Sequence, residues 1–202
     1  MAANYIFDRE LNSEMDQLVA ERHLSLLSRG GAFTVAYVDS ALQYVYLKSV
    51  CPIKECIAQG WFPESDLFPS ISHALDGNGI YKMEYYPRVK SLKESLDADQ
   101  WEIYKELRRV MKEIDYTGNV HRNHESITQG FNTIKDESLR ETMQEALDAC
   151  ANYGTQLAFE ISPRNVAVKD GKLILLDVFY HVEKLEEIRK EQAKRRRMIC
   201  RF

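Results

Sequence analysis

The sequence predicts an α+β fold, with strands gathered in the first half of the chain and helices in the second. Short runs rich in β-branched and aromatic residues are concentrated before residue 86. Longer stretches with apolar residues at helical spacing follow after it. The chain has 202 residues, 45% of them hydrophobic, a size and composition that suit one domain or two closely packed lobes.

The strand-rich half is expected to begin with a helix. Apolar residues recur mostly at helical spacing over residues 8–28, and Gly30 and Gly31 then interrupt the pattern. The segments that follow predict two strands, a short helix, a loop and two further strands, in the order 32–38, 44–50, 52–59, 63–69, 70–75 and 80–86.

The helix-rich half contains three predicted helices, at 98–114, 136–153 and 182–198. The stretch 116–133 between the first two is polar and reads as irregular. Two short strands, 166–168 and 173–177, are expected on either side of a tight turn at Asp170-Gly171. The boundary between the halves is expected at 86–91, just after the last strand of the first half.

Composition argues against several classes of protein. The net charge of −4 is unlike that of a general nucleic-acid binder, which is usually basic. A short basic run at 194–197 is more simply a solvated helix end than a contact for RNA or an acidic partner. No apolar run is long enough to span a bilayer, and the N-terminus has no signal-peptide pattern. A cytoplasmic protein without a membrane partner is therefore expected.

Cysteines and histidines give no metal-site pattern of their own. The four cysteines have no CxxC or zinc spacing and read as reduced thiols. His121 and His124 have the spacing H-x-x-H, but they lie in a polar segment without further ligands at suitable spacing, so a solvated pair is the better interpretation.

The stretch 159–180 carries the pattern with the most chemical content. Glu160 is followed by Asn165 five positions later, then by the tight hairpin, and then by Asp177 at the end of an apolar strand. Phosphoryl transfer needs a carboxylate to orient the attacking hydroxyl, and a carboxamide with a second carboxylate to hold Mg²⁺ against the phosphates. A hairpin with a solvated Glu160 and with Asp177 capping the next segment is the structural alternative.

This stretch resembles the catalytic loop and metal-binding strand of protein kinases, H-R-D-x-x-x-x-N followed by D-F-G. The resemblance implies a bilobal fold with an antiparallel β-rich N-lobe at 29–88, preceded by an N-terminal helix at 1–28. A truncated helical C-lobe at 89–202 would end in the basic helix. ATP and Mg²⁺ are the implied cofactors, with Glu160 as catalytic carboxylate and with Asn165 and Asp177 on the metal.

The resemblance extends upstream of the catalytic stretch. Gly30 and Gly31 lie where a glycine-rich loop would cover the phosphates, and Val45-Tyr46-Leu47-Lys48 looks like the V-A-I-K strand. Lys48 would then contact the phosphates. Glu84 and Tyr86 lie where the hinge would contact the nucleotide, and the glutamate of the helix after the lysine strand would be Glu55 or Glu64.

The chain is most similar to the small early Ser/Thr protein kinases of T7-type bacteriophages, whose loop tip also reads like G-x-F-x-x-A-Y. Compact bacterial effector kinases are a second possible relative. The phage family phosphorylates host proteins during infection, so the resemblance implies host-protein substrates.

Departures from the kinase pattern leave a second function open. Glu160 stands in place of Asp, Tyr46 in place of the small residue that lies against adenine, and Phe179 in place of the D-F-G glycine. Little of a usual C-lobe follows Asp177. The alternative to an active kinase is therefore a pseudokinase that binds and inhibits a host or defence protein. A different ATP-dependent chemistry on the same scaffold is the third possibility.

Overall fold

The computed structural model describes residues 9–28, 33–75, 79–116 and 123–199. The chain forms two compact units. The first unit comprises Met1–Ala58, Ile71–Tyr85 and His181–Phe202, and the second comprises Gln59–Ser70 and Tyr86–Tyr180. The α+β class expected from the sequence is confirmed.

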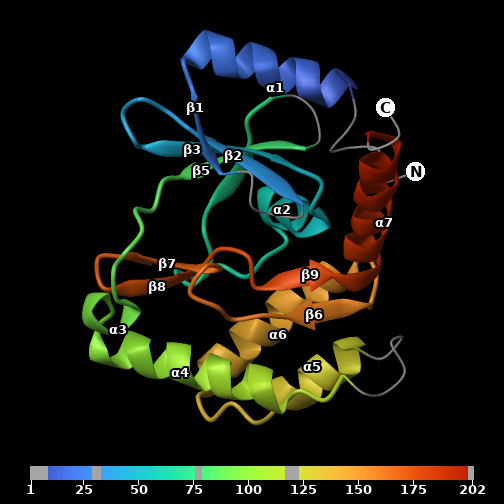
Figure 1. The fold of residues 1–202 in the computed structure, drawn as a ribbon. Coiled ribbons are helices and arrows are strands. Elements are labelled where there is room, and N and C mark those ends of the chain that lie inside the picture. The colour runs from blue at the N-terminus through green and yellow to red at the C-terminus, as the bar shows by residue number, and fades with distance from the viewer. Residues whose placement is uncertain (1–8, 29–32, 76–78, 117–122, 200–202) are drawn as a thin grey trace. The chain divides into compact units, whose positions relative to one another are not determined.

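The first unit is built on a five-stranded antiparallel sheet with the order β1-β2-β3-β5-β4. Its strands are β1 (Ser25–Ser28), β2 (Thr34–Val38), β3 (Tyr44–Ser49), β4 (Ile71–His73) and β5 (Ile80–Glu84). Its helices are α1 (Arg9–Arg22), α2 (Pro52–Ala58) and α7 (Val182–Ile199). In Figure 1, α1 and α2 lie on different sides of this sheet.

The two faces of the sheet can be assigned from strand register, because side chains alternate between faces along a strand. Tyr46 and Ile80 belong to one face, where they pack with Met15 and Leu18 of α1. On the other face, Tyr81 is paired with Leu47 and bonds to a residue of α2. The sheet therefore separates an α1 side from an α2 side.

The helix expected over 8–28 is too long. It ends at Arg22, and His23 takes a positive φ of 52°, which a continuing helix does not allow. Leu26 and Leu27, whose spacing suggested a helix, belong instead to the edge strand β1, where both are exposed. The pairing of β1 with β2 prevailed over the local apolar pattern.

The second unit contains helices around two small strand pairs. Its helices are α3 (Leu92–Ser95), α4 (Ala98–Glu113), α5 (Asn123–Phe131) and α6 (Glu137–Ala151). Its strands are β6 (Leu157–Phe159), β7 (Val166–Lys169), β8 (Lys172–Leu175) and β9 (Phe179–His181), whose last residue already belongs to the first unit. β7 pairs with β8 and β6 with β9.

The segment 116–133, expected to be irregular, contains the helix α5. Its buried residues Ile127 and Phe131 are four positions apart, so they lie on one face of the helix. Gly130 allows close approach to α4, because a Cβ there would lie 2.7 Å from the side chain of Ile114. The short elements α3, β6 and β9 were also not predicted.

None of the helices in the described part of the chain is long and apolar enough to cross a membrane.

Candidate functional site

The hairpin of β7 and β8 brings Asn165 and Asp177 together. Val166 is paired with Leu175, so the residues just beyond the open end of the hairpin face each other. The carbonyl oxygen of Asn165 accepts the backbone N–H groups of Leu176, at 2.9 Å, and of Asp177, at 3.3 Å. The turn between the strands has positive φ at both central positions, 50° at Asp170 and 78° at Gly171, as a tight two-residue hairpin turn requires.

Glu160 is fixed to the same segment by its backbone. Its N–H donates to the carbonyl oxygen of Val178 at 2.8 Å, one residue after Asp177. The N–H of Asn165 donates to the carbonyl of Ser162 at 3.0 Å and closes a turn in the loop that runs from Glu160 to Asn165. Three residues of the predicted site, Glu160, Asn165 and Asp177, are thus tied together by four backbone hydrogen bonds, and all three side chains are half-buried.

The loop that begins at Glu160 is held against α4. Ile161 is fully buried, its carbonyl accepts from Arg108 Nη1 at 3.3 Å, and its N–H lies 3.1 Å from the sulfur of Met111. The preceding residue, Phe159, donates its N–H to the hydroxyl of Tyr116 at 3.0 Å. Because both backbone neighbours of Glu160 are anchored, the start of the loop has a defined position.

The donor chemistry of this cluster fits Mg²⁺ better than a softer metal. Asn165 and Asp177 supply hard oxygen atoms, and Mg²⁺ is usually held by one or two carboxylates together with phosphate and water. Among the described residues, no group of three or more His, Cys, Asp and Glu side chains is arranged to hold a metal ion by itself. Phosphate oxygens and water would complete the coordination of any Mg²⁺ bound here.

Lys48, the lysine expected on the phosphates, lies on β3 in the first unit. Its Nζ donates to Oδ1 of Asn12 in α1. It shares the α1 side of the sheet with Tyr46, which is 3% exposed and packs against Met15. Tyr46, expected to crowd the nucleotide, is therefore part of the core beneath α1, and Arg22 Nη1 contacts its hydroxyl at 3.3 Å.

Glu55, one of the two candidate helix glutamates, lies on the α2 side of the same sheet. Its Oε2 accepts from the Tyr81 hydroxyl at 2.9 Å and lies 3.0 Å from Nε2 of His73. Burial, followed by the hydrogen bond to Glu55, raises the pKa of Tyr81, so the phenol stays protonated and donates to the carboxylate. Lys48 thus contacts α1 on one side of the sheet, and Glu55 of α2 contacts Tyr81 on the other side; in active kinases the corresponding lysine and glutamate contact each other.

The remaining predicted residues belong to other segments of the chain. Glu84 ends β5 opposite Tyr44, and Tyr86 begins the second part of the second unit. Glu64 is exposed in the segment 59–70. Gly30 and Gly31 lie outside the described residues.

Lys54 is a residue that the sequence did not single out. It belongs to α2 and is only 4% exposed, which is rare for lysine. Its only signal in the sequence is its position between Ile53 and Cys56, two other buried residues of this short helix.

Comparison with known proteins places the chain in no group: no protein-family model, curated protein or solved structure matches it.

Proposed function

We propose that this protein is an ATP- and Mg²⁺-dependent kinase-like protein of phage origin, which transfers phosphate to Ser or Thr of host proteins in the host cytoplasm. The observation that carries the proposal is the backbone bonding that ties Glu160, Asn165 and Asp177 together at the open end of one hairpin. The antiparallel sheet of the first unit, with a lysine on its third strand, supports the same proposal.

Each residue of the cluster has one role in this proposal. The side-chain oxygens of Asn165 and Asp177 hold Mg²⁺, which neutralises charge on the transferred phosphate when it is bound. The carboxylate of Glu160 orients the attacking hydroxyl and accepts its proton. Glu160 is one methylene longer than the usual Asp, and its backbone bond to Val178 fixes where that longer side chain starts.

Glu160→Gln tests the proposal most directly, because it removes the base and keeps the size of the side chain. We expect incorporation of labelled phosphate from ATP into host-lysate proteins to fall by about a hundredfold or more. The increase in Tm that ATP and Mg²⁺ cause should remain, since Asn165 and Asp177 are unchanged. Labelling by Glu160→Gln at the wild-type level would remove Glu160 from the reaction.

A second candidate function is favoured by the position of Lys48. Lys48 donates to Asn12 of α1, which places its ammonium group on the α1 side of the sheet, whereas Glu55 accepts from Tyr81 on the α2 side. A lysine held against α1 in this way fits a pseudokinase that binds and inhibits a host or defence protein. In that case ATP and Mg²⁺ leave the Tm of the wild-type protein unchanged, and a pull-down from host lysate identifies the partner.

Lys48→Ala separates a structural lysine from a phosphate-binding one. We expect the Tm without nucleotide to fall by about 2–4 °C, since losing the contact with Asn12 costs about 1 kcal/mol. The further increase in Tm caused by ATP and Mg²⁺ should equal that of the wild type. Asn12→Ala is the matched control, because it removes the same contact and keeps the lysine. Loss of the nucleotide effect in Lys48→Ala alone would place Lys48 on the phosphates, as the sequence predicts.

A further inference from the structure

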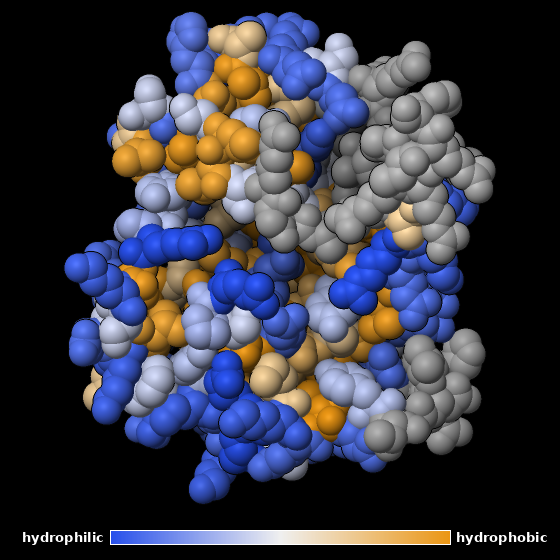
Figure 2. All heavy atoms as spheres, viewed as in Figure 1, coloured by the Kyte–Doolittle hydropathy of each residue, from blue (hydrophilic) through white to orange (hydrophobic). Residues whose placement is uncertain are grey.

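A cationic groove lies along α4 in the second unit. Its volume is about 500 Å³, and all of its lining residues come from this one helix. The aromatic residues Trp101 and Tyr104 line one end, and the charged residues Lys105, Arg108, Arg109, Lys112 and Glu113 line the rest. Hydrophilic residues dominate the surface at the bottom of Figure 2, where Figure 1 places α4. We call this feature the α4 groove.

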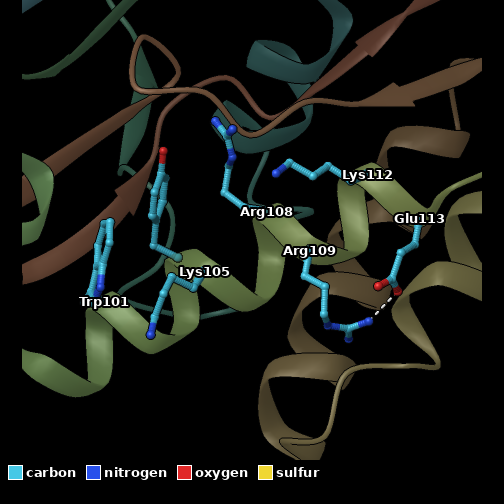
Figure 3. Close-up of a pocket in the computed structure, with 7 residues that line it drawn as sticks. Trp101, Lys105, Arg108, Arg109, Lys112 and Glu113 are labelled. Carbon is cyan, nitrogen blue, oxygen red and sulfur yellow. Dashed lines mark hydrogen bonds and ion pairs between the residues drawn. The ribbon is translucent and has the colours of Figure 1, made fainter.

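Two of the four cations are compensated within the helix. Arg109 contacts both carboxylate oxygens of Glu106 at 2.9 Å and also pairs with Glu113, as the dashed line in Figure 3 marks. The hydrogen bond from Arg109 is also the main cause that lowers the pKa of Glu106. Lys105 pairs with Glu102 at 2.6 Å. The charge of Lys105 is therefore balanced by Glu102, and that of Arg109 is more than balanced by Glu106 and Glu113.

Arg108 and Lys112 are different. Within the described part of the chain, neither has an ion-pair partner. They are four residues apart on one helix face, and Figure 3 shows the Lys112 side chain extending toward Arg108. Two like charges at this spacing destabilise a helix by about 0.2–0.5 kcal/mol. Lys112 lies in the last turn of α4, where a positive charge interacts favourably with the helix dipole. Arg108 lies before that turn and does not gain this stabilisation.

Arg108 also links the groove to the candidate site. It donates one N–H to the carbonyl of Ile161, the residue after Glu160, and a guanidinium has four further N–H donors. A chain bound along α4 would therefore pass beside the start of the loop that carries Glu160.

The aromatic end gives the groove an apolar surface. The rings of Trp101 and Tyr104 are stacked, with centroids 5.3 Å apart and planes 24° apart. Trp, Tyr and Arg are enriched among the few residues that carry most of the binding energy in protein interfaces. From Trp101 to Lys112 the helix rises about 16 Å, the length of about five extended residues.

We propose that the α4 groove binds an acidic stretch of the substrate polypeptide, with carboxylates on Arg108 and Lys112 and an apolar side chain on Trp101. This inference rests on the proposed function, because it names the substrate class of the Glu160 cluster. Glu113 and Glu106 flank the free cations and would repel a continuous phosphate backbone, so discrete carboxylates fit better than nucleic acid. The net charge of −4 points the same way.

The test is fluorescence anisotropy with the full chain and no nucleotide. The probes are a labelled peptide with Asp and Glu around one Ser, a peptide with Lys and Arg in those positions, and a single-stranded RNA oligonucleotide. We expect the acidic peptide to bind at least tenfold tighter than the basic one, and to weaken as salt is raised. Lys112→Glu should weaken acidic-peptide binding at least tenfold. Arg108→Gln, which keeps a donor for the Ile161 carbonyl, should weaken it severalfold.

Lys93→Glu is the matched control, since Lys93 is an exposed lysine of α3 outside the groove. It should bind the acidic peptide like the wild type. Equal affinity for both peptides, unchanged binding by Lys112→Glu, or tighter binding of the RNA would each overturn the inference. Tight binding of the acidic peptide without phosphate transfer would support peptide binding by the α4 groove and contradict the proposed kinase activity. Phosphate transfer without a preference for acidic peptides would support the kinase activity and contradict the proposed role of the groove.

Discussion

Asp177→Asn is expected to abolish both phosphate transfer from ATP and the stabilisation of the protein by ATP and Mg²⁺. The carboxylate is the only formal negative charge in the proposed Mg²⁺ set, and the amide that replaces it has nearly the same shape. Phosphate incorporation from labelled ATP should fall by about a hundredfold or more, and the rise in Tm caused by ATP and Mg²⁺ should disappear. The measurements are labelled-ATP incorporation and thermal unfolding, each with and without Mg²⁺.

The control for Asp177→Asn is Asp66→Ala, which removes a carboxylate from the same unit. Asp66 is exposed and forms a surface ion pair with Lys172 at 2.5 Å, so its removal should change neither stability nor activity appreciably. The expected results also differ between the two site variants: Glu160→Gln should still bind nucleotide, whereas Asp177→Asn should not. A nucleotide effect that survives in Asp177→Asn would contradict the assignment of the metal position.

The hairpin at 166–177 was the most predictable part of the molecule. An Asp-Gly turn between alternating apolar residues fixes register locally, so Asn165 had to face Leu176 once the turn was recognised. Only a short loop separates Glu160 from Asn165, and the backbone N–H of Glu160 bonds to Val178, just beyond the same hairpin. These three site residues were found because every interaction that joins them lies within 19 residues of chain.

The position of Lys48 could not be predicted in the same way. Alternation along β3 shows that Lys48 and Tyr46 share a face, but it does not show which helix covers that face. The answer depends on α1, whose Asn12 is 36 residues away. Similarly, β6 and β9 are only three residues long, too short for alternation of their side chains to identify them as strands.

Phe131→Ala is expected to cause the largest loss of stability, about 3–5 kcal/mol. Phe131 has no exposed surface, and its ring packs edge-on against Phe159, at 5.1 Å between centroids, and Phe179, at 6.2 Å. Phe159 precedes Glu160, and Phe179 lies two residues after Asp177, so the cavity would open beneath the backbone that positions both carboxylates. Denaturant unfolding measures the loss, with Phe131→Leu as the control that keeps most of the volume and should cost less than half as much.

If Phe131→Ala lowered stability by less than about 1 kcal/mol, the three rings would not form the core that supports the site. If the loss is as large as expected, nucleotide binding should weaken with it, because the frame of Glu160 and Asp177 is then set by a residue of α5 that touches neither substrate nor metal.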